Sequence, residues 1–415
     1  MTDLTRSPES TPIPLRRNWR FQSYWLGTTV GAIGTTMSLL VYPLLALSLT
    51  GSPLLAGLLA ATQAATAVVF GIPAGALADR FSRRNLLLSS EALRTLATGA
   101  VLALVATDAV NIAGLFVAAV VLGLSGAIGM PVRRLALRSI VPDEQLRQAL
   151  SQDEVRVNIA MLAGPPLAGS LFAVGWVQPF IVALACYVAS FCSACLTRLP
   201  ATGQQPGPLK ASNLFRGAMV GPKVVWNDPV LRAVTGLMTL ENLIFAALNL
   251  ILINHFQQQG IDARTIGLAL SGEAIGYLTG AALVTRLHRR FRPGLLLLGV
   301  VWTSLLVTAA LLFVTSPLGV FLLLLVISLG KPALYVLIDV IVFQQVDDSI
   351  RGRVISGSFT VLAVGGPIGS AVAGLLLGHL PHAASIGLFC LLLIVPLCAG
   401  TLSRRLRRAE WPDQP

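Results

Sequence analysis

Long apolar runs, separated by short segments that are polar or rich in glycine and proline, fill most of the chain. A helix needs about 20 mainly apolar residues to cross roughly 30 Å of membrane hydrocarbon. Twelve runs reach this length, so we predict twelve transmembrane helices. Their approximate bounds are 22–49, 53–78, 85–106, 110–130, 155–174, 178–199, 230–254, 265–287, 293–315, 318–343, 354–379 and 383–402.

The longest polar interval divides these helices six and six. We predict an all-α membrane protein with an N-terminal tail (1–20), a six-helix bundle (21–199), a central loop (200–229), a second six-helix bundle (230–403) and a C-terminal tail (404–415). A polar, arginine-containing leader precedes the first apolar run, and no short apolar run with a cleavage site stands there. We expect that run to be a retained helix rather than a signal peptide.

Composition and charge agree with a membrane protein. Hydrophobic residues make up 55% of the chain and charged residues 12%, whereas a soluble domain carries about a quarter charged residues. We assign all but two of the 30 Lys and Arg residues to alternate connections or the helix ends beside them, the exceptions being Arg264 and Lys331. This distribution argues against a nucleic-acid partner despite the net charge of +12. The positive-inside rule predicts a multi-pass membrane protein with both termini in the cytoplasm. Arg makes up 27 of the 30 basic residues, which indicates a bacterial source, and we expect the protein in the bacterial plasma membrane.

Three short segments of the first half return in the same order in the second half. The sequence GALADRFSRR at 75–84 returns in weaker form as ALVTRLHRR at 282–290. The sequence GMP at 129–131 matches GKP at 330–332, and GP at 164–165 matches GP at 366–367. Such a repeat indicates duplication, and paired six-helix halves are the layout of many secondary transporters.

The segment 75–84 resembles the signature loop between the second and third helices of the major facilitator superfamily. The helix count and the repeat extend this resemblance over nearly the whole chain. It implies a conformational latch between the halves, formed by Gly75, Asp79, Arg80, Arg83 and Arg84. The second copy has Thr285 in place of Asp79, so we expect the latch in the first loop only. A basic loop that sets topology, with Asp79 capping a helix, is the alternative.

Gly164, Pro165 and Gly169 in the fifth predicted helix resemble the Gly-Pro motif that marks exporters of this superfamily. Proline removes a helix hydrogen bond and glycine permits close approach, which predicts a kinked and tightly packed segment. The spacing GPxxxG departs from the usual GPxxGG, so a kink for packing alone is the alternative. Residues 18–21, 141–146 and 351–354 together resemble the branch of macrolide-efflux proteins and enterobactin exporters.

Charged side chains inside predicted helices are costly and usually functional. Four such residues lie in the second half: Glu241, Glu273, Lys331 and Asp339. We hypothesise that Lys331 pairs with Glu241 or Glu273 near mid-depth, and that protonation of a carboxylate breaks the pair and changes the conformation. A static ion pair that stabilises the second half is the alternative.

In the first half we find no charged residue at mid-span, and we interpret Glu91, Asp108 and Asn111 as interfacial or capping residues. The resemblance implies a central cavity lined by helices one, four, seven and ten. The candidates to line it in the first half are Trp25, Met37, Tyr42, Gln63 and Asn158.

These features predict a secondary active transporter, a proton-coupled exporter of a small amphipathic drug, antibiotic or siderophore that works by alternating access. An importer or lipid flippase of the same fold is the alternative within transport. A receptor or a membrane enzyme is a different class, which the scattered histidines and the lack of a phosphate-binding loop disfavour. We expect no cofactor beyond the proton gradient, no metal, and a monomer whose partners are its small-molecule substrate and the lipid bilayer.

Overall fold

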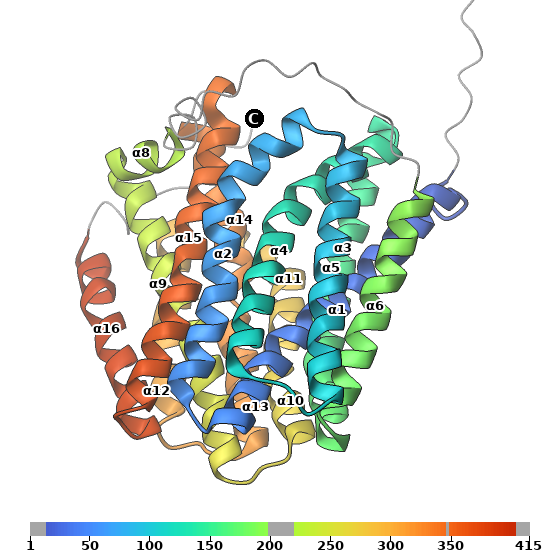
Figure 1. Ribbon diagram of the computed structural model, residues 1–415. Coiled ribbons are helices and arrows are strands. Elements are labelled where there is room, and N and C mark those ends of the chain that lie inside the picture. The colour runs from blue at the N-terminus through green and yellow to red at the C-terminus, as the bar shows by residue number, and fades with distance from the viewer. Residues whose placement is uncertain (1–13, 198–219, 346–347, 404–415) are drawn as a thin grey trace, which may run out of the picture.

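The computed structural model describes residues 14–197, 220–345 and 348–403, and within them it contains helices and no strand (Figure 1). Twelve helical segments of this part are long and apolar enough to cross a membrane, which confirms the predicted fold class and number of spans. The first six spans are α1 (Trp19–Thr50), α2 (Pro53–Arg80), α3 (Arg83–Ala106), α4 (Ile112–Ile140), α5 (Leu146–Val174) and α6 (Val177–Leu196), with a short 3-10 helix, η1 (Asp143–Gln145), before α5.

The second half begins with a short helix and contains two interrupted spans. Its elements are α8 (Val220–Asn227), α9 (Pro229–Gln258), α10 (Ala263–Leu270), α11 (Gly272–Arg290), α12 (Pro293–Ala310), α13 (Pro317–Ser328), α14 (Lys331–Gln345), α15 (Asp348–Leu377) and α16 (His382–Leu402). The eighth span is divided into α10 and α11 at Ser271, and the tenth into α13 and α14 at Leu329 and Gly330. Interrupted helices near mid-membrane are typical of transporter binding sites.

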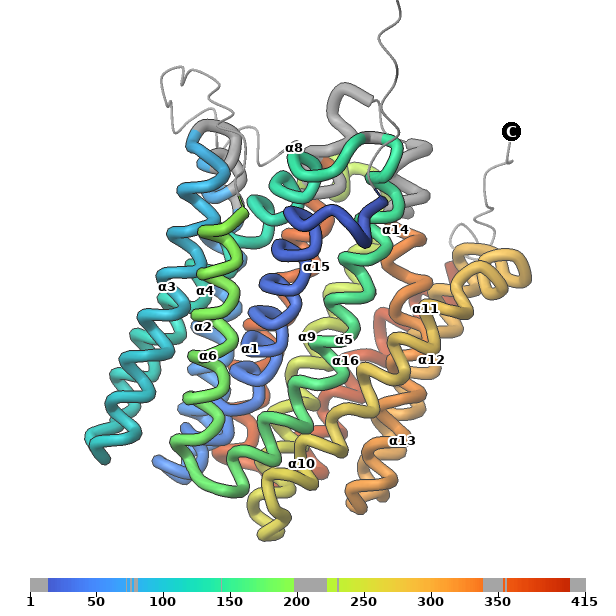
Figure 2. The backbone as a smooth tube through the Cα atoms, turned by 90° about the vertical axis from the view of Figure 1, so that its right-hand side faces the viewer, coloured from blue at the N-terminus to red at the C-terminus, as the bar shows by residue number. Residues whose placement is uncertain are grey.

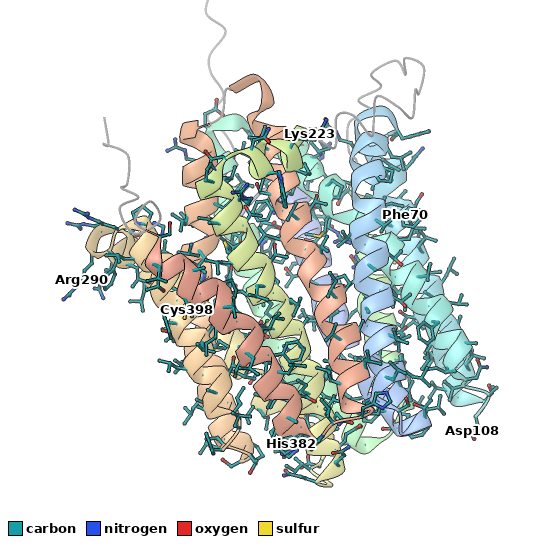
Figure 3. All side chains as sticks on the ribbon, turned by 90° about the vertical axis from the view of Figure 1, so that its left-hand side faces the viewer. Phe70, Asp108, Lys223, Arg290, His382 and Cys398 are labelled. Atoms are coloured by element: carbon teal, nitrogen blue, oxygen red, sulfur yellow. The ribbon has the colours of Figure 1, made fainter. Side chains whose placement is uncertain are left out.

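The two ends of the bundle differ in charge. In Figure 3, Lys223 lies at one end and Asp108 and His382 lie at the other. We call the end with Lys223 the basic end, and the other the opposite end. Large apolar side chains such as Val395 of α16, which is 70% exposed, cover the outer surface between the ends, as expected for contact with lipid.

Small residues let helices pack closely within each half. A Cβ atom added to Gly34 of α1 would press against Cys186 and Tyr187 of α6. Three glycines of α11, spaced four residues apart, would meet backbone carbonyls of the tenth span: Gly272 meets Phe321, Gly276 meets Leu325, and Gly280 meets Leu329. This is the small-xxx-small packing that brings membrane helices together.

The halves meet mainly through two helix pairs, α2 with α15 and α5 with α10. Gly57, near the start of α2, lies against the backbone of Ser370 and Gly374 on α15. Figure 2 shows α5 and α10 side by side near the bottom of the view, at the opposite end. The contacts described here between the halves therefore close the opposite end of the bundle.

The α5–α10 contact begins at the capped start of α10. Asp262 is the N-cap, and its carboxylate accepts hydrogen bonds from the hydroxyl of Thr265 at 2.7 Å and from the backbone N–H of Thr265 at 3.1 Å. These bonds hold the pKa of Asp262 below its ordinary value. The cap fixes the start of α10, where the carbonyl of Ala263 faces Gly169.

Candidate functional site

A cavity of about 490 Å³ lies between the two halves. Its lining comes from α1, α2, α5, α9, α10, α11 and α15, namely Thr36, Leu39, Leu40, Pro43, Ala60, Ala64, Met161, Pro165, Phe245, Ala246, Asn249, Leu250, Ile253, Leu270, Glu273, Ala274, Gly366 and Ser370. Pockets that hold drug-sized molecules usually measure 300–1,000 Å³ and are mostly apolar with a few polar groups. This cavity has the size and polarity to hold a small amphipathic molecule.

Glu273 is the charged residue in the described lining of this cavity, and it pairs with Lys331. Lys331 Nζ lies 3.8 Å from Glu273 Oε1, and the side chains are 15% and 21% exposed. The ammonium group also lies over the ring of Phe245, 3.0 Å from its centroid. An aromatic face attracts a cation, so Phe245 holds Lys331 beside the cavity wall together with Glu273.

Glu241 lies behind this pair in a more enclosed setting. Ser304 of α12 donates a hydrogen bond of 2.8 Å to Glu241 Oε2, and within the described part of the chain Oε1 has no hydrogen-bond partner. Glu241 and Lys331 both line a second, small pocket of about 20 Å³, together with Asn242 and Tyr335. The structure thus places one lysine beside two buried carboxylates.

The sequence-predicted charges of the second half gather as expected with one exception. Glu241, Glu273 and Lys331 lie together in the structure, and Lys331 forms its ion pair with Glu273. The side chain of Asp339 lies outside the described residues. The interruption of the tenth span directly before Lys331 is a feature that the sequence reasoning missed, although Gly330 was a signal for it.

The residues expected to line the cavity in the first half lie outside its described lining. Met37 and Tyr42 are buried in the core, where Tyr42 packs edge-on against Phe180 with ring centroids 5.6 Å apart. Trp25 Nε1 donates a hydrogen bond of 2.9 Å to the carbonyl of Gln152. Gln63 and Asn158 are half-buried beside residues that do line it.

The described lining differs in part from the set of helices that the resemblance implies. Among the described residues, α1 and α9 line the large cavity, α4 does not, and the tenth span contributes to the small pocket through α14. Helices α2, α5, α10, α11 and α15 complete the wall instead. The reason is the closed opposite end, where α2 meets α15 and α5 meets α10 around the cavity.

The first half contains a buried charge cluster that the sequence analysis misread. Glu91 is 0% exposed and Arg94 is 5% exposed, so neither is interfacial. Glu91 forms an ion pair with Arg94 through Oε2, and its Oε1 lies 3.2 Å from Arg133 Nη2 on α4. Burial of an acid requires compensation, and the spacing of three residues between Glu91 and Arg94 on one helix was the signal for it.

The two predicted motifs lie at different places. The Gly-Pro segment of α5 lies between helices of both halves: a Cβ at Gly164 would overlap Thr36 of α1, and one at Gly169 would meet the carbonyl of Ala263 of α10. In the latch segment, Arg83 Nη1 donates a hydrogen bond of 2.8 Å to Ser139 Oγ, and Arg84 is exposed. The surroundings of Gly75 and the side chains of Asp79 and Arg80 lie outside what the structure describes.

The chain is similar over most of its length to a family of membrane transporters and to drug efflux pumps. A model of the transmembrane secretion effector family matches residues 9–414. The multidrug efflux pump Tap of Mycobacterium tuberculosis is 26% identical over 396 residues, covering 91% of each chain. Tap of Mycolicibacterium fortuitum is 25% identical over 399 residues, covering 93% of this chain and 96% of its own.

Two solved structures share the fold at low sequence identity. A bacterial homologue of the human lysosomal transporter Spinster, in an inward-facing and unoccupied conformation, matches with a TM-score of 0.74 at 13% identity over 97% of this chain and 100% of that one. The nucleoside transporter NupG matches with a TM-score of 0.69 at 13% identity, over 95% and 100% of the two chains.

Proposed function

Because this chain belongs to the transmembrane secretion effector family of the major facilitator superfamily, we propose that it exports small amphipathic drug molecules in exchange for protons. The membership confirms the superfamily predicted from the sequence and a transporter function. The family and the relatives are transporters rather than enzymes.

One observation carries the proposal: a cavity of about 490 Å³ between the halves, mostly apolar, with the Glu273–Lys331 ion pair at its wall. Apolar lining binds the body of an amphipathic molecule without a fixed pattern of hydrogen bonds, which suits varied drugs. The name of the Tap relatives, multidrug efflux pumps, supports export and drugs over import, lipid movement or a siderophore cargo.

The charge of the two ends supports one orientation of the protein in the membrane. By the positive-inside rule, the basic end faces the cytoplasm, and both termini lie there. The Tap relatives come from bacteria, which supports a bacterial plasma membrane as the location. The contacts of α2 with α15 and of α5 with α10 then close the external side. We infer an inward-facing state in which the cavity receives its substrate from the cytoplasm. In this state the Gly-Pro segment of α5 lies at the closed external side. The latch segment 75–84 acts in the outward-facing state.

Coupling to protons uses the ion pair. Lys331 lies beside two carboxyl groups, those of Glu273 and Glu241, and a proton on one of them removes its charge and its attraction to Lys331, which leaves Lys331 to pair with the other. A proton can shift the equilibrium between the inward-facing and outward-facing states only if it binds one state more tightly than the other. The ion pair with Lys331 supplies such a difference in proton affinity. Since the cavity is enclosed by helices of one chain, we infer that the monomer is the working unit.

Drug accumulation in cells tests the proposal. Bacteria that produce the protein are loaded with ethidium, and cellular fluorescence is followed with and without a protonophore. We expect lower accumulation in producing cells than in cells with an empty vector, and loss of the difference on adding the protonophore. Equal accumulation in both strains, at equal protein levels in the membrane, would refute export of this class of compound.

A further inference from the structure

The charge count around the small pocket is unequal. Two carboxyl groups, of Glu241 and Glu273, share one ammonium group, that of Lys331. The other ionisable side chain described beside both carboxyl groups is a phenol, that of Tyr335 on α14. A net charge inside a membrane protein is costly, so the group at rest holds one proton, which makes it neutral.

The geometry selects the carboxyl group that holds this proton. Glu273 lies 3.8 Å from Lys331 and begins α11, so both the ammonium and the positive end of the helix stabilise its charged form. Glu241 is only 9% exposed, and Ser304 is its one described hydrogen-bond donor, on Oε2. The proton therefore resides on Glu241.

We propose that Lys331 exchanges partners during transport: a cationic group of the substrate pairs with Glu273 in the cavity, and Lys331 then pairs with Glu241, which gives up its proton. The inference rests on the proposed function and names its substrate class, an amphipathic molecule with one positive charge. Glu273 is the recognition residue because it lies in the cavity lining, whereas Glu241 lines only the small pocket behind it.

The step balances in charge and in protons. Before binding, the group holds Glu273 as carboxylate, Lys331 as ammonium and Glu241 as neutral acid. After binding, two carboxylates face two cations, the substrate and Lys331, and one proton has left. The small pocket, about 20 Å³, has room for one water between Glu241 and Lys331, through which the proton passes towards the cavity. Release of the substrate outside reverses the step, so one proton enters for each cation that leaves.

Proton release on binding tests the exchange directly. Purified protein in weakly buffered detergent solution is titrated with ethidium, a monovalent cation, while a pH indicator dye reports free protons. We expect the wild type to release about one proton per ethidium bound and to bind about tenfold more tightly per unit rise in pH. Chloramphenicol, a neutral amphipathic probe, is expected to bind without proton release.

Variants separate the two carboxyl groups. Glu241→Gln is expected to bind ethidium at least tenfold more weakly, without proton release and with an affinity independent of pH. Glu273→Gln is expected to lose ethidium binding while keeping chloramphenicol binding. Glu144→Gln changes an exposed carboxylate of η1 and is the matched control, expected to behave as wild type.

Ser304→Ala provides a second test of Glu241 in case Glu241→Gln does not fold. It keeps both carboxyl groups but removes the hydrogen bond to Glu241 Oε2, which stabilises the ionised form. We expect the rise of affinity with pH to move to higher pH with its slope unchanged, an effect that a merely structural role of Ser304 would not produce.

The results of these titrations separate failure of the partner exchange from failure of the proposed drug export. Wild type that binds neither probe would refute the proposed function itself. Ethidium binding without proton release, or release that persists in Glu241→Gln, would refute the partner exchange and leave drug export standing. Proton release on binding chloramphenicol would refute recognition of the cation by Glu273.

Discussion

Lys331 Nζ lies 3.8 Å from Glu273 Oε1, and each residue lies in the first turn of a half-helix within an interrupted span. The positive N-terminal end of α11 favours the carboxylate of Glu273, whereas the same end of α14 disfavours the ammonium of Lys331. Lys331 therefore depends on Glu273 and on the ring of Phe245. The pair joins the eighth and tenth spans beside the cavity.

Loss of Lys331 alone should harm the protein more than loss of the whole pair. Lys331→Met leaves the carboxyl groups of Glu241 and Glu273 without a cation beside them. The double variant, Lys331→Met with Glu273→Gln, removes both charges of the ion pair, so that neither is left unpaired. We expect the double variant to be more stable than the single one, with a coupling energy of about 1 to 3 kcal/mol in a double-mutant cycle of thermal unfolding. Additive effects of the two substitutions would show that the pair contributes no stability.

A single added methyl group at the α5–α10 contact should change the conformational equilibrium. In Gly267→Ala, the Cβ would run into the carbonyl of Pro165, at a cost of about 1 to 3 kcal/mol in the state where these helices touch. We expect spin-label distances across the opposite end to lengthen, because the outward-facing state becomes populated. Gly299→Ala on α12, where an added Cβ meets no atom within 4 Å, is the control and should leave the distances unchanged.

The buried cluster of the first half should be a stability element. Glu91→Gln leaves Arg94 and Arg133 without their carboxylate in a buried site, and we expect a loss of about 3 to 5 kcal/mol. Arg84→Ala removes an exposed charge and should change stability by less than about 0.5 kcal/mol. Unfolding of purified protein in detergent measures both. Equal stabilities would mean that Glu91 is not required to compensate the arginines.

The cap of α10 predicts a pH dependence. Hydrogen bonds from Thr265 lower the pKa of Asp262, so its contribution to stability is present above the unfolded-state pKa and disappears as pH falls through the folded-state pKa. We expect Asp262→Ala to be less stable than wild type at neutral pH and to approach it in acid. A stability difference that stays constant into acid would contradict a role for the ionised carboxylate.

The membrane-spanning architecture could be predicted from the sequence because hydropathy and charge act over whole segments. Each of the twelve predicted runs coincides with an observed span, including the two that prove to be interrupted. The pairing of Lys331 with a buried carboxylate could also be predicted, since an isolated charge in the membrane is costly and the candidates were few.

The first half was harder to predict because depth and helix rotation both matter. Glu91 lies roughly 12 Å along α3 from its start, a depth at which sequence alone does not separate interface from interior. Similarly, Thr36 and Leu40 line the cavity, whereas their neighbours Met37 and Tyr42 face the core. A rotation of about 100° per residue decides between the two, and only packing fixes it.

Transport by the purified protein tests the central claim most directly. Protein is reconstituted into liposomes with an acidic interior, and ethidium uptake is followed by its fluorescence, with Glu273→Gln and protein-free liposomes as controls. We predict that wild type accumulates ethidium in the acidic interior as protons leave, that a protonophore abolishes the accumulation, and that Glu273→Gln stays at the protein-free level. Uptake that does not require the pH gradient, or that Glu273→Gln retains in full, would contradict proton-coupled transport through this site.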